Sequence, residues 1–264
     1  MSLAATSPER VFAILEMFER ERRPLSLKEL AEYCQIPTST CHALVHTLIK
    51  RAYLYQTGHR KELYPTRRLY DMGATFVSND AVLQRLLPVM EALRESTEET
   101  VILGKRHEDS VLYLEVLEGP QTIRYSARVG ERKPLHSTSI GKSILSGLKA
   151  EEIRQWLEQH PPAKVTEKTI TSYARLMDDL EQGNKHGYFI TRGENVPDVT
   201  AVSIPVSVNN QLFGLAVAGP SPRVEARFDN VIRAVQDALK SLLDQRIADR
   251  SSSSDPRRQP LSGT

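Results

Sequence analysis

Three short stretches near the N-terminus repeat the same apolar spacing. In each, apolar residues recur at positions i, i+3, i+4 and i+7, which places them on one face of an α-helix. The three sets are Val11, Ile14, Leu15 and Phe18; Leu27, Leu30, Ala31 and Cys34; and Cys41, Leu44, Val45 and Leu48. Helices this short cannot bury an apolar stripe alone, so the three must share one core. The spacing predicts a compact three-helix unit.

The ends of these helices are also marked in the sequence. Ser7-Pro8 is a typical helix start, and Ser26 with Glu29 forms a capping box that begins the second helix. Only residues 35–37 (QIP) separate the second helix from the third. So short a connection is typical of a helix-turn-helix, whose later helix enters the major groove of DNA.

The third helix presents a polar face on the side opposite its apolar stripe. Short polar side chains at a helix start, together with the free N–H groups there, suit contacts with phosphates and base edges. A three-helix bundle without a DNA-binding role is the alternative. From the helices we predict DNA contacts by Ser26, Thr38, Ser39, Thr40, His42, Ala43, His46 and Lys50.

A hairpin is predicted directly after these helices. Residues 53–57 and 62–64 are rich in strand-forming residues, and residues 58–61 between them resemble a turn. This is the wing of a winged helix, in which Arg60 and Lys61 would contact phosphates. The whole chain has a net charge of only +2, but between residues 35 and 68 one acid, Glu62, stands among six basic residues: Lys50, Arg51, Arg60, Lys61, Arg67 and Arg68.

The remainder of the chain predicts a second domain of mixed secondary structure. We expect a helix over 81–95, kinked or restarted at Pro88, strands over 100–103, 111–117 and 123–129, helices over 139–148, 150–159 and 172–186, strands over 201–208 and 212–218, and a long helix from about 227. This order is typical of an α+β fold. The predicted organisation is a winged helix-turn-helix over 1–65, a connecting segment over 66–79, an α+β domain over 80–249 and a disordered tail over 250–264.

A polar stretch that leads into one of these helices is the best candidate for a ligand site. A helix start offers unpaired N–H groups and a positive dipole end, which suit a carboxylate, and Gly141 would let the backbone approach a ligand closely. Simple helix capping without a ligand is the alternative. The stretch comprises His136, Ser137, Thr138, Ser139, Ile140 and Gly141.

Three blocks of sequence together resemble the IclR family of bacterial transcription regulators. They are residues 10–73, with RV, LKELA, IPTST, LYPT and RLYDMG; residues 134–145, PLHSTSIGKSIL; and residues 187–220, with GY, Glu194, VSIPV and AGP. The resemblance implies a linker helix over 66–79 and a GAF-like effector-binding domain over 80–249. It also implies dimers or tetramers, and effector contacts from Glu194, Ala201, Ser203, Ala216 and Ala218. The side chains at Ala201, Ser203, Ala216 and Ala218 are small, and a pocket lined by Ile140 and these alanines favours a carboxylate with an apolar or aromatic body. Family members often carry arginine at the position of Ala43, so a guanine contact is missing here.

The sequence lacks the residues that nucleotide hydrolysis, serine-hydrolase catalysis or metal binding would require. Gly141-Lys142-Ser143 resembles the end of a P-loop, but His136 stands where the first glycine should be, so we expect Lys142 to face solvent or pair with an acid. No Gly-x-Ser-x-Gly elbow supports a hydrolase. Adjacent residues 107–109 (HED) would splay apart, and two cysteines build neither a zinc site nor a disulfide framework. We therefore expect neither a cofactor nor a metal.

The sequence as a whole predicts a cytoplasmic regulator that is not an enzyme. There is no apolar run long enough to span a membrane and no signal-peptide core in residues 1–10. The expected partners are double-stranded operator DNA, a small-molecule effector of the carboxylate class, and further copies of the chain in a homodimer or homotetramer. The alternative is a metabolite-processing enzyme with a helical N-terminal appendage.

Overall fold

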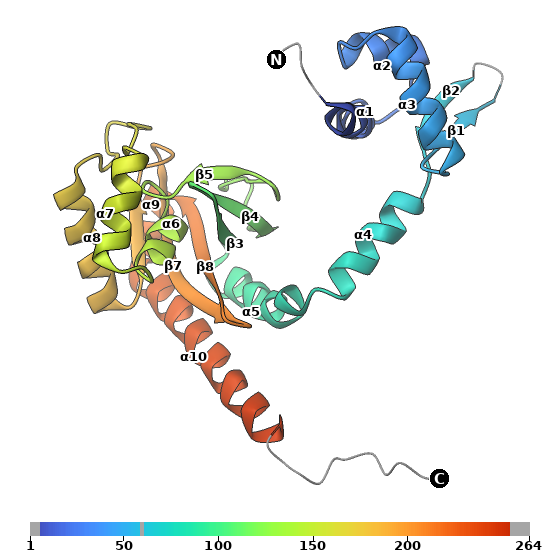
Figure 1. The fold of residues 1–264 in the computed structure, drawn as a ribbon. Coiled ribbons are helices and arrows are strands. Elements are labelled where there is room, and N and C mark those ends of the chain that lie inside the picture. The colour runs from blue at the N-terminus through green and yellow to red at the C-terminus, as the bar shows by residue number, and fades with distance from the viewer. Residues whose placement is uncertain (1–5, 59–60, 254–264) are drawn as a thin grey trace, which may run out of the picture. The chain divides into compact units, whose positions relative to one another are not determined.

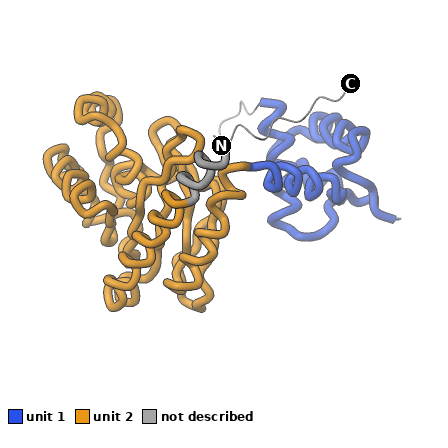
Figure 2. Tube along the Cα trace, turned by 90° about the horizontal axis from the view of Figure 1, so that it is seen from below, with its two compact units in different colours: residues 1–80 blue, residues 81–264 orange. Residues whose placement is uncertain are grey.

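The computed structural model describes residues 6–58 and 61–253, with side chains up to residue 244. The chain divides into two compact units, Met1–Asp80 and Ala81–Thr264 (Figure 2). None of the helices in the described residues has the length and apolar character needed to cross a membrane.

The first unit has the predicted three helices and hairpin. Helices α1 (Ser7–Glu21), α2 (Leu27–Tyr33) and α3 (Thr38–Lys50) precede strands β1 (Leu54–Thr57) and β2 (Glu62–Pro65), which pair antiparallel. The first helix is capped by Thr6, one residue earlier than predicted, in a capping box with Glu9. All three apolar stripes contribute to one core, which the hairpin completes through Leu54 and Leu63. A fourth helix, α4 (Arg68–Ser78), follows.

The second unit is built on a six-stranded antiparallel sheet with the order β5-β4-β3-β8-β7-β6. Its strands are β3 (Thr100–His107), β4 (Ser110–Leu117), β5 (Arg132–Pro134), β6 (Phe189–Arg192), β7 (Val199–Val208) and β8 (Gln211–Pro220). Helices α5 (Ala81–Thr97) and α10 (Phe228–Ser253) cover one face. Helices α6 (Ser139–Leu145), α7 (Ala150–Gln159) and α8 (Tyr173–His186) cover the other, and the short α9 (Ser221–Ala226) follows β8 (Figure 1).

Alternating residues along the strands divide the core into two layers. Val101 and Leu103 of β3 and Leu215 of β8 face α5 and α10, whereas their neighbours Ile102 and Ala216 face α6 to α8. Successive side chains of a strand point to opposite faces, so a sheet covered on both sides needs apolar residues at nearly every position. This arrangement confirms the predicted α+β fold.

Two glycines let α6 lie unusually close to the sheet. Gly104 of β3 and Gly214 of β8 are directly paired. A Cβ atom on Gly214 would come within 2.7 Å of Ile140 Cγ2, and one on Gly104 within 3.0 Å of the same atom. Larger residues at these positions would lift α6 from the sheet, so the glycine pair sets the depth of the space beside Ile140.

Several predicted elements differ in the structure. Residues 123–129 form no strand, and the strand that pairs with the edge of β4 is β5, which covers Ser110–Leu112. Strand β6 was not predicted, and Pro88 lies inside α5 without ending it, since the apolar stripe on both sides of it stays packed. Helix α10 continues to Ser253, so residues 250–253 are helical rather than part of a tail, and the rest of that expected tail lies outside the described residues.

Candidate DNA interface and effector cavity

The predicted DNA-reading face of α3 is open to solvent. Thr38, Ser39, His42, Ala43, His46 and Lys50 are exposed and Thr40 is half-buried, while Cys41, Val45 and Leu48 on the opposite face are buried. No Asp or Glu occurs anywhere in α3. Such a face suits a polyanion, because no carboxylate on the helix would repel phosphates.

The start of α3 keeps its backbone donors available. Pro37 stands at the N-cap and supplies no side-chain hydrogen bond to the first turn. The first N–H groups of a helix have no partner within the helix, and the dipole there favours anions. The backbone N–H groups at the leading end of α3 can therefore donate hydrogen bonds to a phosphate oxygen.

Ser26 is the N-cap residue of α2. Its hydroxyl donates to Oε2 of Glu29 at 2.8 Å and accepts from the Glu29 N–H at 3.2 Å. Hydrogen bonds from the backbone and side chain of Ser26, followed by one from Arg23, lower the pKa of Glu29 to about 2. The capping box keeps Glu29 ionised, so a DNA contact by Ser26 would compete with these bonds and stays a prediction.

The wing is described only in part. Lys61 is exposed and has a positive φ of 50°, which fits the turn that joins β1 to β2. Arg60 lies outside the described residues, so its predicted phosphate contact stays a prediction. Behind the hairpin, the guanidinium of Arg68 lies 5.0 Å from the centre of the Tyr53 ring, and Arg67 pairs with Asp71 at 3.1 Å.

A small cavity lies in the second unit between α6 and the sheet, with a volume of about 30 Å³. Six predicted effector residues line it: Thr138, Ser139, Ile140, Ala201, Ala216 and Ala218. Seven further lining residues were not predicted: Ile102, Tyr113, Tyr125, Thr191, Asn195, Val196 and Val199. The two-residue period of β3, β4 and β7 could have indicated Ile102, Tyr113 and Val199, but the others come from loops and from β6.

The cavity wall is mostly apolar with a few polar groups. Thr138 is already engaged, since its hydroxyl donates to the Pro134 carbonyl at 3.0 Å and accepts from the Gly141 N–H at 3.0 Å. The side-chain hydroxyls of Ser139 and Thr191 make no hydrogen bond with another described residue, so they are free to meet a ligand. Burial raises the pKa of Tyr113, so its phenol stays protonated.

The other predicted effector residues are buried beside the cavity rather than in its wall. His136 hydrogen-bonds the Ala163 carbonyl through Nε2 at 2.9 Å, and burial lowers its pKa. Ser137 accepts a hydrogen bond from Asn195 Nδ2 at 3.1 Å. Ser203 is buried, and its hydroxyl has no partner in the part of the chain that the structure describes.

Gly141 and Glu194 also serve packing in this structure. A Cβ atom on Gly141 would lie 2.0 Å from the Leu135 carbonyl oxygen, so the close approach is to the protein's own backbone rather than to the cavity. Glu194 pairs with Lys142 at 2.8 Å. Of the two expectations for Lys142, pairing with an acid is confirmed, and exposure to solvent is wrong because the side chain is fully buried.

A winged helix-turn-helix with an open α3, in one chain with an α+β unit that encloses a cavity, defines a transcription regulator with a ligand-binding domain. Two family profiles match the chain: "IclR helix-turn-helix domain" over residues 7–58 and "Bacterial transcriptional regulator IclR C-terminal" over residues 74–242. The chain belongs to the IclR family of bacterial transcriptional regulators. Its relatives are regulators and not enzymes, which rules against the enzyme alternative.

Individual relatives agree with this assignment. The HTH-type transcriptional regulator KdgR of Escherichia coli is 30% identical over 218 residues, covering 83% of this chain and 81% of KdgR. The structure of Thermotoga maritima IclR has a TM-score of 0.73 at 23% identity, covering 89% of this chain and 98% of that one. An IclR homolog of Microbacterium hydrocarbonoxydans, complexed with 4-hydroxybenzoate, has a TM-score of 0.66 at 23% identity, covering 89% of this chain and 100% of that one.

Proposed function

We propose that the protein is a homo-oligomeric regulator that reads operator DNA with α3 and responds to a small carboxylic acid with an apolar or aromatic body. The observation behind the DNA-binding part is the exposed, acid-free face of α3 with its uncapped start. In a helix-turn-helix dimer, two such helices meet half-sites about one DNA turn apart, or a multiple of it.

The lining of the cavity supports the proposed class of effector. Ile102, Ile140, Val199 and the three alanines offer an apolar surface to a ring or an alkyl body. The free hydroxyls of Ser139 and Thr191 can donate to a carboxylate. A helix-end contact adds little, because α6 has only seven residues and Thr138 already takes the Gly141 N–H. The related homolog with bound 4-hydroxybenzoate supports the same class.

Binding of such an acid requires the cavity wall to move. A volume of about 30 Å³ admits one or two water molecules but no aromatic ring. The ligand therefore stabilises an expanded arrangement of the second unit. It changes operator affinity only to the extent that the DNA-bound and DNA-free arrangements differ in their affinity for it.

A mobility-shift assay together with thermal-shift screening tests this proposal. We expect retardation of the DNA upstream of the protein's own gene, and a change in its midpoint when benzoates are added. In the thermal-shift screen, benzoates should raise the melting temperature more than pyruvate or glyoxylate does. Stabilisation by the two short acids alone would exclude the aromatic class. Chemical turnover of a bound acid by the pure protein would favour the enzyme alternative.

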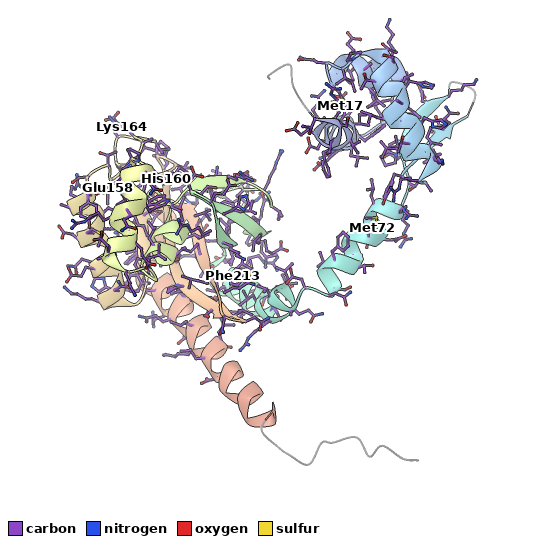
Figure 3. The ribbon with its side chains drawn as sticks, in the orientation of Figure 1. Met17, Met72, Glu158, His160, Lys164 and Phe213 are labelled. Atoms are coloured by element: carbon purple, nitrogen blue, oxygen red, sulfur yellow. The ribbon has the colours of Figure 1, made fainter. Side chains whose placement is uncertain are left out.

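Helix α4 supports the oligomeric part of the proposal. Its apolar residues recur at helical spacing, yet no residue of α4 is buried in the described chain. Met72, labelled in Figure 3, accepts a hydrogen bond from the Tyr53 hydroxyl at 3.3 Å. Tyr70, Phe76 and Val77 are 68%, 66% and 53% exposed. We assign this face to contact with a second copy of α4.

Replacing Phe76 with glutamate should shift the protein toward monomers. Burial of a Phe side chain stabilises by about 1.5–3 kcal/mol, and a symmetric contact loses it twice. Size-exclusion chromatography with light scattering measures the effect. Ser78→Glu adds the same charge to an exposed position on the side of α4 away from Phe76 and should leave the mass unchanged. A wild-type protein that is monomeric with and without DNA would contradict the assignment.

A further inference from the structure

The strongest charged cluster inside the second unit surrounds Lys142. The side chain is fully buried, and its Nζ lies 2.8 Å from Oε1 of Glu194 and 2.8 Å from Oδ2 of Asp179 on α8. It also donates to the Ile190 carbonyl at 3.3 Å. The three N–H donors of the ammonium are therefore matched by three acceptors from three different segments.

This cluster joins two walls of the cavity. Lys142 follows Thr138 by one turn of α6, and the Lys142 N–H donates to the Thr138 carbonyl at 2.9 Å. Its partner Glu194 directly precedes Asn195 and Val196, which line the cavity. We propose that Lys142 is a positioning residue that holds the wall segment 193–196 against α6 and so sets the geometry of the effector cavity.

Neighbouring hydrogen bonds show how the wall segment is held elsewhere. Thr166 donates to the Gly193 carbonyl at 2.7 Å, and Thr169 donates to the Glu194 carbonyl at 2.7 Å. These bonds hold the backbone of the segment to residues 166 and 169. The Lys142 ammonium holds the Glu194 side chain and so forms an ionic link between this segment and α6.

Stability alone is a weak reason for burying such a cluster. The desolvation of a buried ammonium and carboxylate offsets much of their attraction, and apolar residues of similar volume often stabilise a fold as well. A buried ion pair does fix geometry, because a charge removed from its partner inside the protein is strongly disfavoured. Burial raises the pKa of Glu194, and the Lys142 ammonium, with a smaller contribution from the Arg192 backbone, acts to lower it.

The small volume of the cavity explains why positioning matters for an effector. Part of the wall must move to admit a ligand, and a wall segment that stays ordered while the rest moves costs less conformational entropy when the ligand binds. Without the Lys142–Glu194 link, Asn195 and Val196 would sample more arrangements. The expected effect on effector affinity rests on the proposed function. The structural role of the Lys142–Glu194 link, which is to hold segment 193–196, does not.

The test compares Lys142→Met/Glu194→Gln, which leaves no unpaired buried charge in the pair, with Asp179→Asn, which keeps the Lys142–Glu194 contact. Hydrogen exchange of the backbone amides of residues 189–200 is measured on the ligand-free full chain. We expect exchange at 193–196 to be at least about ten-fold faster in the double variant and unchanged in Asp179→Asn. Glu194→Gln alone, in which Lys142 keeps Asp179, provides the same comparison if the double variant does not fold.

In a second experiment, calorimetric titration measures the affinity of each variant for benzoate. We expect the double variant to bind benzoate about ten-fold more weakly than the wild type, with a similar melting temperature. Unchanged hydrogen exchange at residues 193–196 would show that Lys142 does not hold this wall segment. Faster exchange with unchanged benzoate affinity would overturn the positioning role. If benzoate does not bind the wild type, the proposed effector class fails, and the exchange result still decides whether Lys142 holds the wall.

Discussion

Replacing His42 with glutamate should lower the affinity for operator DNA by about 100-fold or more. His42 is exposed on α3, outside the buried stripe that contains Cys41 and Val45. The substitution removes a hydrogen-bonding group and adds a negative charge to a helix that has none. Each lost base or phosphate contact costs about 1–3 kcal/mol, and a dimer loses it at both half-sites.

Fluorescence anisotropy with the operator and with a random duplex, at several salt concentrations, measures this effect. Gln182→Glu is the matched control, because it makes the same charge change at an exposed position of α8 in the second unit. The control should bind DNA like the wild type, and both variants should keep the wild-type circular dichroism. An affinity for operator that stays within a factor of three in His42→Glu would show that α3 does not face the duplex.

Replacing Ala216 with valine should reduce the affinity for the effector by at least about ten-fold while leaving DNA binding intact. Ala216 lines the cavity from β8, and its side chain is 1% exposed. Two added methyl groups would occupy most of a space of about 30 Å³. Steric changes of this size in an apolar pocket are worth about 1–3 kcal/mol, which corresponds to a 10- to 200-fold change.

Calorimetry with the acid that gives the largest thermal shift measures the loss, and anisotropy measures DNA binding in parallel. Valine suits a strand, so the melting temperature should change by only a few degrees. Ser207→Val, at an exposed position of β7, is the control for adding a β-branched side chain to the sheet. Unchanged effector affinity in Ala216→Val would place the effector outside this cavity.

The DNA-reading unit was predictable because its signals are local. The apolar spacing of α1 to α3, the Ser26–Glu29 capping box and the short connection before α3 all act within a few residues along the chain. An amphipathic helix must turn its apolar stripe inward, so the stripe that contains Cys41 and Leu48 already determines which residues face outward.

The effector cavity was only partly predictable, because its wall is assembled from distant segments. Ala201, Ala216 and Ala218 line it as expected, but Glu194 and Ser203 do not. The missed residues Tyr125, Thr191 and Asn195 stand in loops or in a strand with no clear sequence pattern. Their side chains reach the cavity only because of how β3, β8 and β7 are ordered and how closely α6 approaches Gly104 and Gly214.

The amino-acid sequence by itself determined the two kinds of unit, the exposed polar face of the third helix, and the family. These follow from periodicity and motifs, which are properties of neighbouring residues. Tertiary structure alone decided that Lys142 is buried between Asp179 and Glu194, that residues 123–129 form no strand, and which side chains enclose the cavity. Pairing of strands and burial of charges depend on contacts between residues far apart in the chain, and no local pattern specifies them.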